Sequence, residues 1–224
     1  MELTKEQIRE TIARRVAQEL KEGDYVTLGI GLPTEVANYI PENVHVMIQS
    51  ENGLIGVGKK PASDKVDPKI TNAGGIPVTT KQGAAFFDSQ MSFAMIRGGH
   101  IDATVLGALQ VDQEGNIANW LVPGVFAPGM GGAMDLVVGA KKVIVAMEHL
   151  AKDQIKILKR CTLPLTAAHE VDLIVTERCV LRVEPEGLVL QEINPLFSLE
   201  DITSTITADL IIPDDLLLAA NHPE

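Results

Sequence analysis

The stretch that decides the fold is Val44-His45-Val46-Met47-Ile48, followed directly by Gln49-Ser50-Glu51-Asn52-Gly53. The apolar run alternates too little in polarity for a half-exposed strand, so it predicts a buried strand of a parallel sheet. The polar cluster then falls at the carboxyl end of that strand, where open α/β sheets bind their ligands. Gly53 permits a sharp turn. The pattern therefore predicts that Glu51 faces a crevice and does the chemistry.

Glu51 would need no neighbouring base to act as a nucleophile. A glutamate has an ordinary pKa of about 4.3, so it is ionised at neutral pH. The chain has no convincing Ser-His-Asp or Cys-His set, which fits a carboxylate nucleophile. A second interpretation stays open from these residues alone, because a glutamate after a strand can be a solvated turn residue or an acid at a helix start.

A glycine loop precedes this strand in the chain. Tyr25–Leu28 is predicted to be a short buried strand, and Gly29-Ile30-Gly31-Leu32-Pro33 a tight turn into a helix over Thr34–Tyr39. The loop lacks the third glycine of a dinucleotide fingerprint. It is either a simple turn or a way to bring backbone amides close to the strand that carries Glu51. The candidate substrate-pocket residues are Gly29, Gly31 and Asn52.

A second glycine stretch is Gly129-Met130-Gly131-Gly132-Ala133-Met134-Asp135-Leu136. Three glycines before a predicted helix over Ala133–Val138 place a row of backbone N–H groups at a helix N-terminus, which favours negative charge. A tetrahedral oxyanion needs such preorganised donors. Gly131, Gly132 and Ala133 are therefore candidate donors, and the alternative is a flexible connecting loop.

The remaining pattern predicts one α/β domain over residues 1–224. Helices are expected from Thr4 to Gly23, from Asp88 or Ser89 to Ile96, and over Leu199–Ile206. The further expected strands are Ile76–Thr79, Ala84–Phe87, Ala103–Leu109, Lys142–Met147, Ile155–Lys159, Leu173–Thr176, Val180–Val183, Leu188–Glu192 and Ala208–Ile212.

Composition narrows the class of protein. A formal charge of −11 argues against a nucleic-acid ligand, which lysines and arginines would have to neutralise. Cys161 and Cys179 lie in no disulfide or zinc spacing, so we expect free thiols and no metal site. Neither a signal segment nor a membrane span is expected from the sequence, which favours a cytoplasmic protein.

Several motifs together resemble the β subunits of family I CoA-transferases, including those of acetoacetate and other 3-oxoacids. The similar segments are Leu28–Pro33, Gln49–Gly56, Phe93–His100, Ala118–Trp120, Gly129–Leu136 and Cys161–Thr166. The resemblance covers nearly the whole chain. It implies that Glu51 is the nucleophile, and that the fold has three layers with helices on both faces of an open sheet, as in some sugar-phosphate isomerases.

The resemblance also implies a partner and a substrate. A separate α subunit of similar size is expected, in an α2β2 assembly, with coenzyme A as a substrate and no resident cofactor. Thr27 departs from the asparagine that many relatives carry before the glycine loop. Thr27 is therefore a candidate for the acyl-binding site. Either its hydroxyl makes the polar contact that the asparagine makes in those relatives, or backbone amides make that contact instead.

The sequence thus predicts a β subunit that moves CoA between a short-chain acyl-CoA and a 3-oxoacid such as acetoacetate. Butyrate or acetate is the expected second acid. Two other functions stay open: an acyl-CoA hydrolase that uses the same Glu51, and a non-catalytic ligand-sensing module on the same fold.

Overall fold

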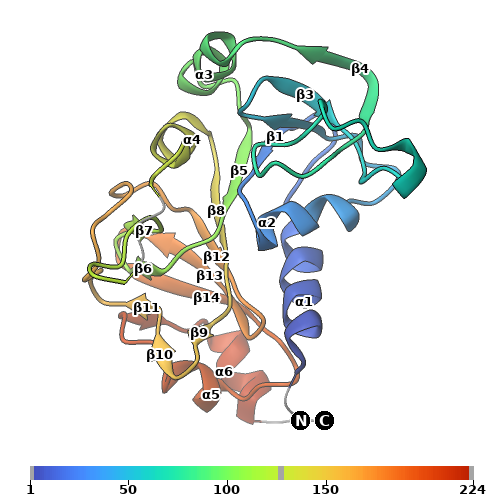
Figure 1. Ribbon diagram of the computed structural model, residues 1–224. Helices are drawn as coiled ribbons and strands as arrows, with labels where there is room; N and C mark the ends of the chain where they lie inside the picture. Colours follow the sequence, from blue (N-terminus) through green and yellow to red (C-terminus); the bar gives the residue numbers. More distant parts are fainter. Residues whose placement is uncertain (1–2, 126–128, 222–224) are drawn as a thin grey trace. The chain divides into compact units, whose positions relative to one another are not determined.

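The computed structural model describes residues 3–125 and 129–221. They form two compact units. One, here the Glu51 unit, comprises residues 13–107 and 132–143, and the other, the C-terminal unit, comprises the described residues of 1–12, 108–131 and 144–224. Both combine helices with a mixed sheet, so the predicted α/β class is confirmed (Figure 1). A single domain over 1–224 stays a prediction, and each unit is described by itself.

The sheet of the Glu51 unit has the strand order β5-β1-β2-β3-β4. Its strands are β1 (Tyr25–Leu28), β2 (Met47–Ser50), β3 (Leu54–Val57), β4 (Thr80–Phe86) and β5 (Ala103–Leu106). The central strand β1 pairs in parallel with β2 and β5, whereas β2 with β3 and β3 with β4 are antiparallel. The sequence predicted a strand of a parallel sheet before Glu51. The strand β2 is parallel to β1 but antiparallel to β3, so the prediction holds on one side only.

The strand before Glu51 starts later than predicted, at Met47 instead of Val44. Val44 instead closes a turn, because its N–H donates to the Pro41 carbonyl at 2.9 Å. Gln49 and Ser50 are buried inside the strand and not after it. Their side chains find partners there, since the Gln49 amide donates to Ser92 Oγ at 3.0 Å and Ser50 Oγ accepts from the Ala73 N–H at 2.8 Å.

Helices cover both faces of this sheet, so the three layers that the resemblance implied are present within the unit. On the face of Gln49 lie α3 (Ser89–Arg97), begun by its cap Asp88, and α4 (Ala133–Gly139). These two helices pack side by side (Figure 1). On the face of Ile48 lie α2 (Leu32–Glu35) and the 3-10 helix η1 (Val36–Asn38). The last turns of α1 (Lys5–Ala17) also belong to this unit.

The strand β4 lies at the edge of this sheet (Figure 1). It replaces two predicted strands: Ile76–Thr79 contributes only an isolated bridge between Thr71 and Pro77, and the second strand starts earlier than predicted. Six of its seven residues are exposed, and Gly83 adopts a φ of +84°. An exposed strand has no hydrophobic alternation, so its bounds could not be found from the apolar pattern.

The sheet of the C-terminal unit has the order β15-β14-β13-β12-β8. Its strands are β8 (Val143–Ala146), β12 (Leu173–Val175), β13 (Cys179–Glu184), β14 (Gly187–Ile193) and β15 (Leu210–Ile211). Each overlaps a predicted strand, and β15 lies at the sheet edge. The two helices of this region are α5 (Leu199–Thr203), begun by a capping box at Ser198, and α6 (Asp214–Asn221).

Short ladders complete the C-terminal unit. A hairpin pairs β6 (Gln110–Asp112) with β7 (Ile117–Ala118), and β11 (Ile157–Leu158) adds to β6 in parallel. The predicted strand Ile155–Lys159 is wrong as one element, because it divides between β11 and β10 (Gln154–Ile155). The strand β10 pairs instead with β9 (Leu150–Ala151). The helix α6 was not predicted, although Pro213 and two acids in its first turn are helix-start signals.

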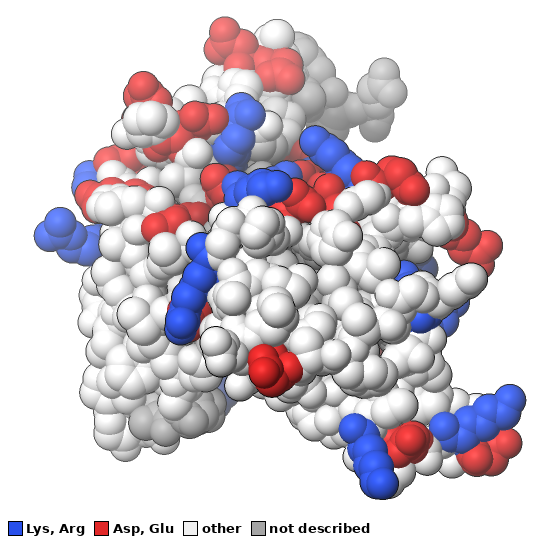
Figure 2. Space-filling model, turned by 90° about the horizontal axis from the view of Figure 1, so that it is seen from above, with Lys and Arg blue, Asp and Glu red and all other residues white. Residues whose placement is uncertain are grey.

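The surface seen in Figure 2 carries Lys and Arg side chains interspersed with Asp and Glu. On that face no broad blue area is visible, so it offers no basic surface of the kind that binds phosphate backbones. None of the helices in the described chain is long and apolar enough to cross a bilayer.

The neutral form of a buried histidine, His149, stabilises the C-terminal unit. The His149 side chain is fully buried, with its ring nitrogens 3.1 Å from Thr176 Oγ1 and 3.0 Å from Thr205 Oγ1. Burial, together with the nearby charges of Arg178 and Lys156, lowers the pKa of His149 from 6.5 to about 3. The folded protein therefore resists a proton that the unfolded chain accepts.

We expect His149→Gln to flatten the loss of stability in acid. Between the unfolded pKa of 6.5 and the folded pKa of about 3, only the unfolded chain binds the proton, so stability falls as the pH falls. The slope from this group is about 1.4 kcal/mol per pH unit. Denaturant unfolding from pH 7 to 4.5 measures it, with the exposed His100→Gln as a matched control. Parallel curves for the wild type and His149→Gln would contradict this role.

Candidate active site

Glu51 lies in a tight turn between β2 and β3. The turn closes through the Gly53 N–H, which donates to the Ser50 carbonyl at 3.0 Å. Gly53 has a φ of +111°, and any Cβ there would overlap the Phe87 carbonyl oxygen. The Phe87 N–H in turn donates to the Gly53 carbonyl at 3.0 Å. Only glycine fits this crossing, and its backbone fixes where the Glu51 side chain starts.

The Glu51 carboxylate contacts the start of α4. The backbone N–H of Gly132 hydrogen-bonds it, so the carboxylate lies on the sheet face that carries α3 and α4. A Cβ at Gly132 would overlap Glu51 Oε2 and would stand 3.0 Å from Glu51 Cδ and 3.1 Å from Phe93 Cζ. Gly132 has an ordinary φ of −84°. A side chain at this position would therefore displace the Glu51 carboxylate, although the backbone conformation would accept it.

The protonation of Glu51 reflects three opposing influences. Partial burial is the largest and raises the pKa of the carboxyl group. The Gly132 N–H lowers the pKa, because it donates to the charged form, and the nearby Asp135 carboxylate raises it. The net direction is upward. The carboxylate is therefore more basic than a solvated glutamate.

An arginine balances the charge of Asp135. Arg97 Nε lies 2.7 Å from Asp135 Oδ1 and pairs the last turn of α3 with the first turn of α4. The Arg97 guanidinium also lies over the Phe93 ring, 5.5 Å from its centroid. The side chains of Phe93, Arg97 and Asp135 thus form one connected wall beside Glu51.

A row of buried polar side chains crosses the sheet next to this wall. Thr104, Thr27 and Gln49 occupy paired positions on three neighbouring parallel strands, so they point to the same face. The Thr27 hydroxyl donates to Thr104 Oγ1 at 2.8 Å, and the Gln49 amide is bound to Ser92 on α3. The hydroxyl proton of Thr27 is therefore engaged within the sheet, and its role in acyl binding stays a prediction.

The other candidate residues have local roles that the structure makes clear. Gly29 continues the pairing of β1 with β5, where a Cβ would stand 2.8 Å from Leu106 Cδ2. Gly31 caps α2 with a φ of +87°. The Asn52 amide donates to the Thr71 carbonyl at 2.9 Å and so ties the Glu51 turn to the next loop. None of the contacts described for these three residues reaches the Glu51 carboxylate.

The glycine loop before α4 has two kinds of glycine. Gly131 is exposed, has a φ of +55°, and would meet nothing within 4 Å if it carried a Cβ. Gly132 is buried against Glu51, and Ala133 is the first residue of α4. The structure therefore joins Glu51 to Gly132 among the predicted donors, and donation by Gly131 and Ala133 stays a prediction.

Three residues of the site lie in the recognised motifs but were assigned no role from the sequence: Phe93, Arg97 and Asp135. Phe93 and Arg97 are four residues apart on α3, so they share one face, and the sequence predicted a helix that ends one residue before Arg97. No sequence signal joins Asp135 to them, because its neighbour Arg97 is 38 residues away in the chain.

The cysteines are not candidates for the chemistry. Burial, with the Asp112 carboxylate nearby, raises the pKa of Cys161 to about 12, and burial likewise raises the pKa of Cys179 to about 12. Both thiols are therefore protonated and unreactive at neutral pH. Within residues 3–125 and 129–221, no group of three His, Cys, Asp or Glu side chains is arranged to hold a metal ion.

Comparison with known proteins defines the class. The sequence matches the profile of the coenzyme A transferase family over residues 9–205. The chain belongs to this family, and is thus an enzyme that transfers CoA.

Within the family it corresponds to a β subunit. It is 56% identical over 209 residues to the β subunit of the acetate CoA-transferase of Escherichia coli K12, covering 93% of this chain and 95% of the relative. It is 48% identical over 203 residues to the corresponding subunit of the succinyl-CoA:3-ketoacid coenzyme A transferase of Helicobacter pylori 26695, covering 90% and 98%.

A solved structure supports the fold. The chain superposes on an acyl-CoA transferase of Escherichia coli O157:H7 with a TM-score of 0.76 and 23% identity, covering 96% of this chain. This chain spans only 44% of that longer protein. At this identity the likeness speaks for the fold alone.

We expect Gly132→Ala to lower the rate of CoA transfer by about 10²-fold. The added methyl group would displace the Glu51 carboxylate, and a misplacement of about 1 Å in a reacting group lowers rates by about this factor. Initial rates at saturating substrate measure the effect. Gly83→Asn is a suitable control, since it changes an exposed glycine with open space around it, and asparagine tolerates a positive φ. Unchanged transfer by a folded Gly132→Ala protein would contradict the close approach.

Proposed function

We propose that this chain is the catalytic β subunit of a transferase that moves CoA between a short-chain acyl-CoA and a 3-oxoacid such as acetoacetate, through a glutamyl-CoA thioester on Glu51. The observation that carries the proposal is the partly buried Glu51 carboxylate at the end of β2, hydrogen-bonded by the Gly132 N–H.

In the first half of the reaction, a Glu51 oxygen attacks the thioester carbonyl carbon of the acyl-CoA. The carbon–sulfur bond breaks, CoA leaves as a thiolate, and a mixed anhydride joins Glu51 to the acyl group. The thiolate then attacks the Glu51 carbonyl carbon and expels the free carboxylate. The result is the Glu51-CoA thioester, with all atoms of the acyl donor accounted for.

The second half reverses these steps with another acid. Its carboxylate attacks the Glu51 thioester carbonyl, CoA thiolate leaves, and the thiolate attacks the acyl carbonyl of the new anhydride. This restores the Glu51 carboxylate and releases the second acyl-CoA. A nucleophilic carboxylate suits the route, because an anhydride keeps the acyl group reactive while a serine ester does not.

Each addition forms a tetrahedral oxyanion that backbone donors stabilise. Gly132 supports such a role through its position against Glu51, and Gly131 and Ala133 are its neighbours in the chain. Water must stay out, because it would hydrolyse the anhydride. Hydrolysis through the same Glu51 is the alternative reaction, and family membership supports transfer over both hydrolysis and ligand sensing.

The names of the relatives support the substrate class. They refer to acetate and to succinyl-CoA with a 3-ketoacid, so small carboxylates and 3-oxoacids are the substrates that we propose, with butyrate as a further acid. Because both relatives are single subunits of their enzymes, we also propose an α subunit as the partner, in an α2β2 assembly. The chain alone should then lack turnover, and addition of the α subunit should restore it.

We expect Glu51 to become attached to CoA when the enzyme and its α partner receive an acyl-CoA without an acceptor acid. Borohydride should reduce the thioester to the alcohol, and peptide mass spectrometry should place the change on Glu51. Initial rates should follow a ping-pong pattern, because the first product leaves before the second acid binds. Glu51→Ala should give neither the adduct nor transfer.

The matched control is Glu186→Gln, which changes an exposed glutamate in the turn between β13 and β14. It should label and turn over as the wild type does. Two results would refute the route through a Glu51 thioester, even if the protein transfers CoA. One is labelling of another glutamate, and the other is a kinetic pattern in which both substrates bind before any product leaves.

We expect the pH dependence of transfer to respond to Arg97 and Asp135 in opposite directions. Glu51 attacks only when ionised, so the rate falls as the pH drops through its pKa. Asp135 raises that pKa, and Arg97 compensates its charge. Arg97→Gln should therefore move the acid limb of kcat/KM to higher pH, and Asp135→Asn should move it to lower pH.

The control for this pair is Arg182→Gln, which removes an arginine from an ion pair with Glu184 at the surface of the C-terminal unit. Its pH profile should match the wild type. Shifts of the same sign in Arg97→Gln and Asp135→Asn would contradict the electrostatic balance.

A further inference from the structure

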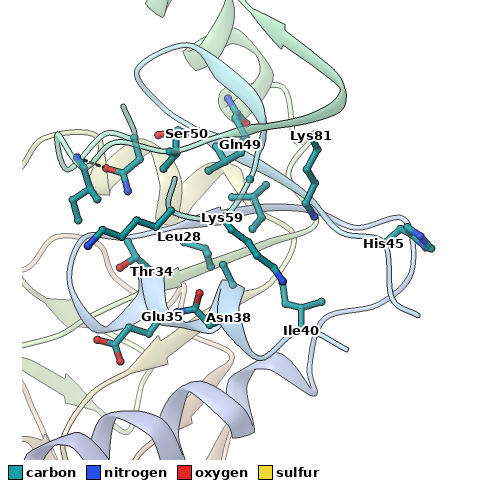
Figure 3. A pocket seen from close by; sticks show the side chains of 18 of the residues that line it. Leu28, Thr34, Glu35, Asn38, Ile40, His45, Gln49, Ser50, Lys59 and Lys81 are labelled. Atoms are coloured by element: carbon teal, nitrogen blue, oxygen red, sulfur yellow. Dashed lines mark hydrogen bonds between the residues drawn. The ribbon is translucent and has the colours of Figure 1, made fainter. Parts of the chain in front are cut away.

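A concave site lies in the Glu51 unit, on the sheet face of Ile48, and Figure 3 shows it from close by. It is a cavity of about 400 Å³, within the range of sites for small organic ligands. Its walls come from α2, η1 and the segments 40–45, 58–60 and 72–81. We call it the lysine groove, after Lys59, Lys60 and Lys81, which line it.

The sheet separates the lysine groove from the active site. Ile48, Gln49 and Ser50 of β2 all contribute to the groove lining. Side chains alternate between the faces along a strand, and the Gln49 amide donates to Ser92 on α3, so the Ile48 and Ser50 side chains lie on the groove face. The Glu51 carboxylate lies with Gly132 on the α3 and α4 face and is not part of the groove lining. A ligand in the groove would therefore occupy a site of its own.

The base of the groove is apolar and elongated. Its aliphatic side chains are Leu28, Ile40, Ile48, Val57 and Val78. The lining includes His45, before β2, and Ser50 at its end, and at about 3.3 Å per residue an extended chain between them spans at most roughly 17 Å. A compact anion would leave this surface uncovered, whereas an alkyl chain would cover it.

Ammonium groups are available at this apolar surface. Figure 3 shows the Lys59 and Lys81 side chains reaching into the same hollow, while the Glu35 carboxylate lies away from both. The Lys81 ammonium donates to the Val46 carbonyl at 3.2 Å, which orients it inward. In residues 3–125 and 129–221, no carboxylate lies within ion-pair distance of the Lys59 or Lys60 ammonium. Unpaired cations are notable in a chain with a net charge of −11.

We propose that the lysine groove binds a free carboxylic acid with a medium-length alkyl chain. The carboxylate would meet the ammonium groups of Lys59 and Lys81, and the alkyl chain would lie along the aliphatic base. Glu42, which also lines the groove, carries the opposing charge and favours a ligand with a single negative charge. The site is independent of the proposed function.

The probe is sodium octanoate, titrated into the full chain by calorimetry and followed by methyl NMR of Ile48, Val57 and Val78. We expect saturable binding with shifts in these three residues. Across butanoate, hexanoate and octanoate, each buried methylene should tighten binding about fourfold. 1-Octanol, which has the chain without the charge, should bind at least tenfold more weakly than octanoate.

The charge variant is Lys59→Gln with Lys81→Gln, which should weaken octanoate binding at least fivefold and leave 1-octanol unaffected. Lys5→Gln with Lys21→Gln makes the same change of net charge at exposed residues outside the groove and should bind like the wild type. Glu51→Gln should also bind normally. Circular dichroism checks that each variant is folded.

Three results would overturn the proposal. Equal octanoate affinity in the Lys59 and Lys81 variant would exclude the ammonium contact. Loss of binding in Glu51→Gln would place the acid in the active site, a result that leaves the glutamyl route standing. Affinity that does not rise with chain length would exclude the aliphatic base.

Discussion

The contact between the Gly132 backbone and the Glu51 carboxylate is the constraint on which the active-site geometry depends. It requires that α4 begin where β2 ends, and that no side chain stand between them. A second glycine fixes the other end of the same helix, because a Cβ at Gly139 would overlap the Ile96 carbonyl oxygen on α3. Two close approaches, one at each end of α4, thus set the distance of α4 from the turn and from α3.

This arrangement balances two properties of Glu51: the basicity of its carboxylate and the fraction of that carboxylate that is ionised. Burial makes the carboxylate more basic, which strengthens a nucleophile, but it also favours the protonated form, which cannot attack. The Gly132 N–H and the Arg97 pair of Asp135 act against that penalty from two helices. The packing of α3 on α4 therefore also influences the pKa of Glu51, because it brings Arg97 to Asp135.

The sequence predicted what depends on local pattern. The alternation and runs of apolar residues located β1, β5, β8 and the strands of the C-terminal unit, and the polar cluster after one strand placed Glu51 correctly at its end. Capping residues located α3 and α5 for the same reason. Gly132 was among the predicted donors because it belongs to a row of glycines before a predicted helix.

What the sequence could not supply depends on partners distant in the chain. Gln49 and Ser50 looked like residues beyond a strand, because nothing in their neighbourhood shows that Ser92 and the Ala73 backbone satisfy them. The pairing of Arg97 with Asp135, and the groove behind β2, likewise join segments that only the fold brings together.

The exposed edge strand β4 has a consequence for how this chain behaves in solution. A seven-residue strand at the end of a sheet presents free backbone N–H and C=O groups, which can template pairing with a strand of another molecule. Gly83, with its positive φ, interrupts the flat extended geometry that such pairing needs. A glycine in the middle of β4 thus disfavours pairing of this edge with a second molecule.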